Sequence, residues 1–92
     1  MDNPVRMRVL IEGQLQGVNF RLHTQEQADR LDISGFVRVL SDGRIEIDMQ
    51  GTDDNVNQML AWCQEEPHSS LIRTIMYRYD DPIERRSGFT IR

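Results

Sequence analysis

The chain has 92 residues, which suits a single domain over residues 1–92 rather than two domains. Its 38% hydrophobic and 28% charged residues are typical of a globular chain and argue against disorder. The net charge of −4 argues against nucleic-acid binding, which needs a surplus of basic residues.

The single cysteine and the lengths of the apolar runs indicate the cellular compartment in which the protein is expected. One cysteine, Cys63, cannot form an internal disulfide or a metal site by itself, so we expect no metal and a reducing compartment. The first four residues lack the start of a secretory signal, and no apolar run reaches membrane-spanning length. We therefore expect a cytoplasmic protein with no membrane partner.

The first third of the chain predicts a strand followed by a helix. Residues 6–12 alternate in a way that is typical of a strand covered on one face and partly on the other. A helix is predicted from about residue 20, and it ends before residue 34. Its buried face is set by residues spaced three or four apart: Phe20, Thr24, Ala28 and Leu31.

A hairpin and a second helix are predicted next. The turn signal Ser41-Asp42-Gly43 joins strands over residues 36–40 and 45–50. Thr52 is suited to cap the second helix, and Pro67 lies just beyond its end. The apolar stripe of that helix is Val56, Met59, Leu60 and Cys63.

Two more strands complete the predicted fold. Residues 71–79 are rich in β-branched and aromatic side chains, and residues 88–92 form a short last strand after a polar loop. The order is β-α-β-β-α-β with a tail strand. It predicts an α+β fold, the ferredoxin-like split β-α-β sandwich, with an antiparallel sheet and both helices on one face. In the loop, we expect the charged run Glu84-Arg85-Arg86 to be solvated.

Residues 13–21, between the first strand and the first helix, contain a possible anion site. Backbone N–H groups at a helix start have no helical partner and attract anions. Gly17 lets the main chain curl without a Cβ clash, and the forked donors of Arg21 suit phosphate oxygens. Because such turns with an arginine are common, an ordinary surface arginine stays an alternative.

The same residues resemble the acylphosphatase signature, Gly13-x-Leu15-Gln16-Gly17-Val18-x-Phe20-Arg21 followed by Thr24 and Ala28. The resemblance covers nearly the whole chain. It implies the ferredoxin-like fold and hydrolysis of an acyl phosphate to a carboxylate and inorganic phosphate, with no metal or organic cofactor. It continues through Gly35-Phe36-Val37, Asp42-Gly43, Ile45-Glu46-Ile47, Gly51, Trp62, Pro67 and Phe89-x-Ile91-Arg92.

The resemblance also implies the site residues. The family's second catalytic residue is an Asn that holds the attacking water, four residues after the glycine that begins the second strand. Val39 occupies that position, counted from Gly35. Since an isopropyl group cannot hydrogen-bond to water, we expect position 39 to be non-functional and hydrolysis to be slow. The implied phosphate-binding residues are Gln16, Gly17, Val18, Asn19, Phe20 and Arg21, with Arg21 also catalytic.

Three functional hypotheses stay open, so enzyme activity is not decided by the sequence. The first is a slow acylphosphatase, in which Asn19, His23 or Ser41 holds the water; Asn19 is favoured because it lies in the loop. The second is a non-catalytic domain that keeps the anion site. The third, an RNA-binding module, finds little support, because the chain is acidic and its strands offer few aromatic residues. We expect acyl phosphate or inorganic phosphate as the partner, no nucleic acid and, from the family, a monomer.

Structural roles are the simpler interpretation for other notable side chains. We expect His23 and His68 to lie at the surface. Cys63 is expected to be a buried structural thiol, and Trp62 to pack at the edge of the same stripe. Asp32 stands where the family has a glycine at the end of the first helix, and aspartate tolerates a left-handed backbone better than most residues.

Overall fold

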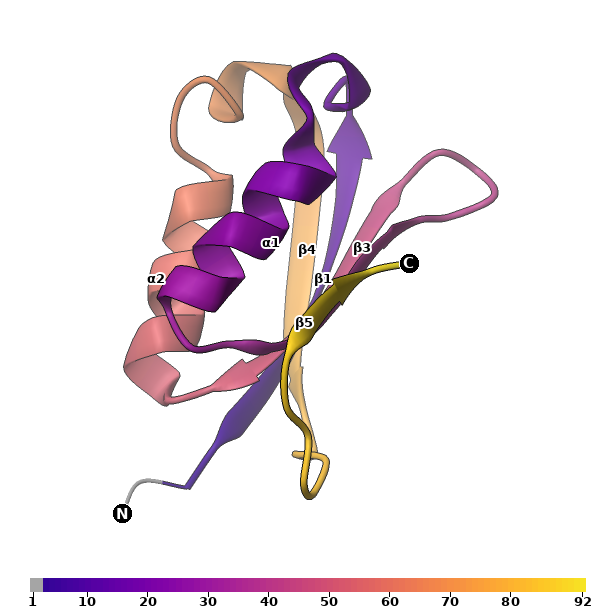
Figure 1. Ribbon diagram of the computed structural model, residues 1–92. Coiled ribbons are helices and arrows are strands. Elements are labelled where there is room, and N and C mark those ends of the chain that lie inside the picture. The colour runs from indigo at the N-terminus through magenta and orange to yellow at the C-terminus, as the bar shows by residue number, and fades with distance from the viewer. Residues whose placement is uncertain (1–2) are drawn as a thin grey trace.

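The computed structural model describes residues 3–92 and shows a five-stranded sheet with both helices packed on one face (Figure 1). The strand order across the sheet is β4-β1-β3-β2-β5. The strands are β1 (Val5–Gly13), β2 (Ser34–Val39), β3 (Ile45–Gly51), β4 (Ile72–Asp80) and β5 (Phe89–Ile91). The helices are α1 (Phe20–Arg30) and α2 (Asp53–Cys63), with short 3-10 turns at Gln16–Val18 and Ser69–Leu71.

The strand pairing confirms the ferredoxin-like arrangement and adds one feature. β1 pairs antiparallel with β3 and β4, and β2 pairs antiparallel with β3. The tail strand β5 instead pairs in parallel with β2, with Phe36 beside Thr90, so the complete sheet is mixed. This follows from the loop at residues 81–88, which reverses the chain after β4 and carries it to the opposite edge of the sheet.

The core lies between the sheet and the helices, as the periodicity predicts. One face of β1 and β3 buries alternate apolar residues against the helices, and removal of this surface from water stabilises the fold. Cys63 is buried, as predicted, and this burial raises the pKa of its thiol to about 12. The buried helix residues are Phe20, Thr24 and Ala28 on α1, and Val56, Met59, Leu60 and Cys63 on α2.

Local chemistry fixes the helix boundaries. The backbone N–H of Asn55 donates to Thr52 Oγ1 at 3.1 Å, which confirms the predicted N-cap of α2. Asp32 follows α1 with φ of 54°, the left-handed conformation that aspartate was expected to tolerate there. Within residues 3–92, neither helix has the length and hydropathy needed to cross a membrane.

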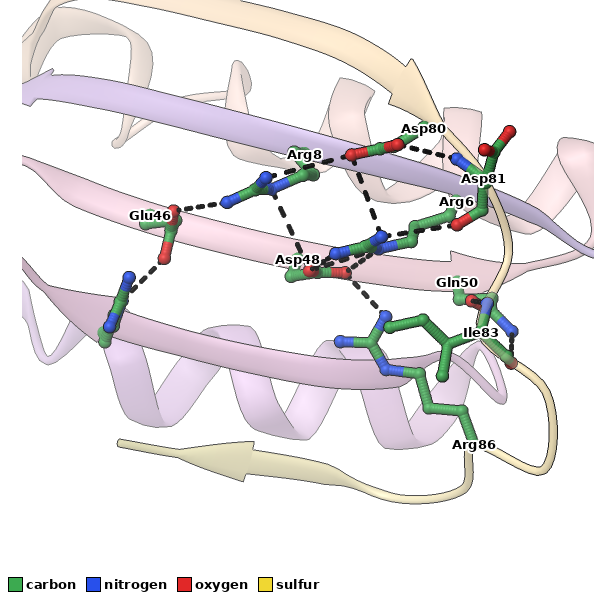
Figure 2. A network of polar contacts seen from close by, with 10 residues as sticks. Arg6, Arg8, Glu46, Asp48, Gln50, Asp80, Asp81, Ile83 and Arg86 are labelled. Carbon is green, nitrogen blue, oxygen red and sulfur yellow. Dashed lines mark hydrogen bonds and ion pairs between the residues drawn. The ribbon is translucent and has the colours of Figure 1, made fainter.

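The sheet face away from the helices carries a network of charged side chains, which Figure 2 shows. Asp48 of β3 is 1% exposed and accepts hydrogen bonds from Arg6 Nη2 at 2.7 Å and Arg86 Nη1 at 2.7 Å. Burial acts to raise the pKa of Asp48, but the hydrogen bonds from the two guanidinium groups outweigh it and hold this pKa below its usual range. A carboxylate can be this deeply buried because its charge is paired.

The Asp48 network also fixes the loop at residues 81–88. The Gln50 side chain donates to the Ile83 carbonyl at 2.8 Å and accepts from the Ile83 N–H at 2.9 Å. Arg86 is only 12% exposed on its side chain, so the prediction that this residue is solvated was wrong. Its long-range partner Asp48 explains the difference, whereas Glu84 and Arg85 are exposed as expected.

Candidate functional site

The predicted anion loop lies at the end of the sheet that also carries the β2–β3 hairpin, since Ile45 pairs with both Ile11 and Val39 (Figure 1). A pocket of about 230 Å³ lies between the loop and the sheet, and we name it the Val39 pocket. Its lining residues are Leu15, Gln16, Asn19, Phe20, Arg21, Leu22, Val39, Ile45 and Ile91. The structure thus brings Arg21 and Val39 to one pocket from sequence positions 18 residues apart.

The shape of the loop depends on other residues than the expected Gly17. A Cβ at Gly17 would meet no atom within 4 Å, and the left-handed residue of the loop is Asn19, with φ of 53° and ψ of 42°. The prediction that Gly17 relieves a Cβ clash was therefore wrong. At Gly13, by contrast, a Cβ would lie 2.3 Å from the Leu71 carbonyl oxygen. The close approach of the 3-10 turn Ser69–Leu71, which precedes β4, therefore requires a glycine at position 13.

The backbone of the loop leaves several N–H groups for a ligand. Val18 N donates to Leu15 O at 3.3 Å, and His23 N donates to Asn19 O at 3.1 Å. In the described part of the chain, the backbone bonds outside the regular elements use no N–H of residues 16, 17, 20 or 21. Amides in the first turn of a helix have no partner within the helix itself. These groups and the positive end of the α1 dipole favour an anion.

The Arg21 side chain is exposed and lines the Val39 pocket. The salt bridges found among residues 3–92 do not include Arg21, and neither do the side-chain hydrogen bonds found there. Its five N–H donors are therefore available to an anion in the pocket. The residues that the strands contribute to the pocket, Val39, Ile45 and Ile91, are aliphatic and offer no side-chain donor or acceptor.

The structure separates the predicted site residues into two groups. Gln16, Asn19, Phe20 and Arg21 line the pocket with Val39, whereas Gly17 and Val18 do not. The three candidates for holding water separate as well. Asn19 lines the Val39 pocket, His23 lines a different hollow beside Trp62, and Ser41 lies in the hairpin turn outside both.

His68 supports this site, although the sequence predicted a surface histidine. The residue is 6% exposed, and its ring centroid lies 5.1 Å from that of Phe20 and 4.5 Å from that of Trp62. Its Nδ1 is 3.2 Å from the Trp62 carbonyl oxygen. Trp62 in turn stacks on Phe20 at 5.7 Å, as its predicted edge position allows. The prediction for His68 failed because its burial depends on rings that only the folded chain brings together.

A second hollow, of about 740 Å³, shares Gln16 with the Val39 pocket, and we name it the charged hollow. Arg44 Nε lies 2.7 Å from Asp42 Oδ2 at its hairpin side, and Arg73 Nη1 lies 3.1 Å from Glu12 Oε1 on the other. The hydrogen bonds from the Arg44 backbone and side chain lower the pKa of Asp42. Sequence motifs gave no sign of this hollow, because three separate segments form it.

Metal binding has no candidate cluster in the described residues. Among residues 3–92, no group of three or more His, Cys, Asp or Glu side chains lies close enough to hold a metal ion.

The fold defines a small α+β domain of the ferredoxin-like type. The acylphosphatase family model matches residues 7–91. Acylphosphatases of Chloroflexus aurantiacus and Natronomonas pharaonis are 36% and 37% identical to the chain; these matches cover 95% and 100% of this chain and 95% and 99% of the relatives. The structure of an acylphosphatase from Coxiella burnetii has a TM-score of 0.84 at 28% identity, covering 98% of this chain and 94% of that one.

These similarities extend over nearly the full length of this chain and of its relatives, so the chain belongs to the acylphosphatase family. The resemblance inferred from the loop motif is confirmed. The family and the fold together support hydrolysis of acyl phosphates as the activity of this class of domain.

Proposed function

We propose that residues 16–21 bind the phosphate group of an acyl phosphate, or inorganic phosphate, and that the chain hydrolyses the acyl phosphate slowly. One observation carries the proposal: Arg21, which has no ion-pair partner among residues 3–92, lines one pocket with Asn19 and Val39. Membership of the acylphosphatase family supports the choice of substrate class.

In the proposed reaction, the phosphate oxygens are held by the Arg21 guanidinium and by those backbone N–H groups of residues 16–21 that have no partner within the fold. Water attacks the phosphorus atom, and the bond between phosphorus and the acyl oxygen breaks. The acyl group leaves as a carboxylate, inorganic phosphate forms, and the proton of the water passes to the phosphate or to solvent. Arg21 stabilises the negative charge on the transferring group in the transition state.

Position 39 sets the proposed rate. The family's Asn would orient the attacking water, and the Val39 side chain cannot donate or accept a hydrogen bond. The loss of one positioning group typically costs on the order of 10² to 10³ in rate. Of the three candidates for holding water, Asn19 is the one that lines this pocket, so we propose slow turnover with Asn19 in this role.

A second function, a non-catalytic anion-binding domain, is favoured by the aliphatic wall that Val39 forms with Ile45 and Ile91. Such a domain would bind the same ligands and release them unchanged. Both versions need no metal or organic cofactor and no nucleic acid. Both describe a monomer in the cytoplasm: the family suggests the monomer, and the single, buried cysteine fits a reducing compartment.

An assay with benzoyl phosphate tests the proposal on the wild type and Val39→Asn. We expect a wild-type rate just above that of buffer and a rise of about 100-fold or more in Val39→Asn, because the asparagine restores a group that holds water. Val5→Asn is the matched control, since Val5 is also half-buried but begins β1 at the opposite end of the sheet.

The outcomes separate the two versions. A wild-type rate equal to that of buffer, with an active Val39→Asn, would favour the non-catalytic domain. An inactive Val39→Asn, together with no effect of phosphate on the amide NMR signals of residues 16–21, would overturn both versions.

A further inference from the structure

The charged hollow and the Val39 pocket share one lining residue. Gln16 lines both, so a molecule held by its phosphate at Arg21 can extend past Gln16 into the larger hollow. The loop before α1, the β2–β3 hairpin and the start of β4 form its walls, and the first two lie at the same end of the molecule in Figure 1. The hollow of about 740 Å³ is roughly three times the size of the Val39 pocket, which is about 230 Å³.

The charges of the hollow are balanced. Two guanidinium groups, of Arg44 and Arg73, and two carboxylates, of Glu12 and Asp42, line it. Each arginine uses only part of its fork on its neighbour, through Nε in Arg44 and Nη1 in Arg73. A guanidinium carries five N–H donors, so each of the two arginines can donate hydrogen bonds to a further carboxylate. The two carboxylates likewise keep oxygen lone pairs for a cationic group.

We propose that the charged hollow is the acyl-group subsite and that it selects acyl phosphates whose acyl part is zwitterionic. Such an acyl phosphate forms when the side-chain carboxyl of an α-amino dicarboxylic acid carries the phosphate, which leaves the α-carboxylate and the α-ammonium free. The ligand carboxylate contacts Arg44 and Arg73, and the ligand ammonium contacts Glu12 and Asp42. The inference rests on the proposed function, because it needs the phosphate group at Arg21.

Other acyl groups fit this set of charges less well. An aliphatic or aromatic acyl group offers no partner to the four charged side chains and displaces water from them. An acyl group with only a carboxylate pairs with the arginines but meets the repulsion of Glu12 and Asp42. Because these side chains are partly exposed, each matched charge contributes modestly, about 2- to 5-fold in affinity. We therefore expect the affinity to rise stepwise with each matched charge of the acyl group.

Three stable phosphonates test the preference, since their carbon–phosphorus bond is not hydrolysed. 2-Amino-4-phosphonobutyrate is zwitterionic beyond the phosphonate, 4-phosphonobutyrate lacks the ammonium, and propylphosphonate lacks both charged groups. Titrations followed by amide NMR should give affinities that fall in that order, with about 5-fold or more between the first and the last. Inorganic phosphate is titrated alongside to test the phosphate site itself.

The variant Arg44→Gln/Arg73→Gln should lower the affinity for 2-amino-4-phosphonobutyrate to that for propylphosphonate, and leave that for inorganic phosphate unchanged. Glu12→Gln/Asp42→Asn should remove the advantage of 2-amino-4-phosphonobutyrate over 4-phosphonobutyrate. Arg30→Gln, an exposed arginine at the far end of α1, is the matched control and should change nothing. Dispersed amide spectra check that each variant is folded.

The possible failures are distinguishable. If inorganic phosphate shifts the signals of residues 16–21 but the wild type binds the three phosphonates equally, the subsite inference is wrong and the proposed function stands. An unchanged preference in Arg44→Gln/Arg73→Gln would also overturn the subsite. If inorganic phosphate shifts no signal in residues 16–21, the proposed function itself fails.

Discussion

The two arginine-containing regions of this small domain contrast in how their charges are satisfied. On the open face of the sheet, Arg6 and Arg86 both contact the buried carboxylate of Asp48, at 2.7 Å each (Figure 2). At the loop end, Arg21 is exposed and has no ion-pair partner within residues 3–92.

The contrast teaches which arginines to assign to function. A guanidinium that fills the hydrogen-bonding capacity of a buried carboxylate has its partner inside the fold, and its removal changes stability. A guanidinium without an internal partner, beside backbone N–H groups at a helix start, is available to an external anion. The Asp48 network is therefore expected to control stability, and Arg21 to control ligand binding.

The largest expected effect is on the stability side. Asp48→Asn leaves Arg6 and Arg86 without their carboxylate in a mostly buried position, and we expect the free energy of unfolding to fall by about 3 kcal/mol. Urea unfolding measures it, with the exposed Asp29→Asn as the control that should change stability by less than about 0.5 kcal/mol. A loss no larger than that of the control would contradict the structural role of Asp48.

The opposite profile is expected for Arg21→Gln. Charge-assisted hydrogen bonds contribute about 1.5–3 kcal/mol, so phosphate affinity should fall about 10- to 100-fold. The free energy of unfolding should stay within about 0.5 kcal/mol of the wild type, because no ion pair or side-chain hydrogen bond found among residues 3–92 involves Arg21. Calorimetric titration with phosphate and urea unfolding give the two quantities. A loss of stability in Arg21→Gln with unchanged phosphate affinity would contradict the contrast between Arg21 and the Asp48 network.

A comparison of the two histidines extends the contrast to the aromatic support of the loop. His68→Ala removes the ring that packs on Phe20 and Trp62, and we expect a loss of about 1.5 kcal/mol in the free energy of unfolding. His23→Ala, at an exposed position on α1, should be close to neutral. Equal losses in the two variants, measured by urea unfolding, would show that the ring packing does not stabilise the loop.

A smaller and graded effect is expected from pH. The pKa of Asp48 is lower in the folded protein than its ordinary value, so the stability that this carboxylate contributes is present above the unfolded pKa of about 3.9. That stability is lost as the pH falls through the folded pKa. Urea unfolding from pH 7 to pH 2 should therefore show wild type and Asp48→Asn converging in the acid range. A constant difference between them would mean that this pKa is not lowered.

The fold was largely predictable because local periodicity encodes it. The stripe from Val56 to Cys63 and the Thr52 cap needed only neighbouring residues, and both are confirmed. The parallel pairing of β5, the burial of Arg86 and the burial of His68 depend on partners far away in the sequence. No local pattern contains that information.

The candidate site divides in the same way. The loop motif predicted Arg21 and the residues around it, the resemblance assigned Val39 to the same site, and the pocket brings the two together. Gly17 was misjudged, because the left-handed residue that turns the chain is Asn19. The charged hollow could not be predicted, since Glu12, Asp42 and Arg73 come from three segments that meet only after folding.

Titration of the folded protein with inorganic phosphate, followed by backbone amide NMR, tests most directly whether the loop and not the open face receives the anion. We expect saturable shifts centred on residues 16–21, with the amides of Asp48, Gln50 and Ile83 unchanged. Shifts centred on the Asp48 network, with none in the loop, would contradict the assignment of Arg21 to ligand binding.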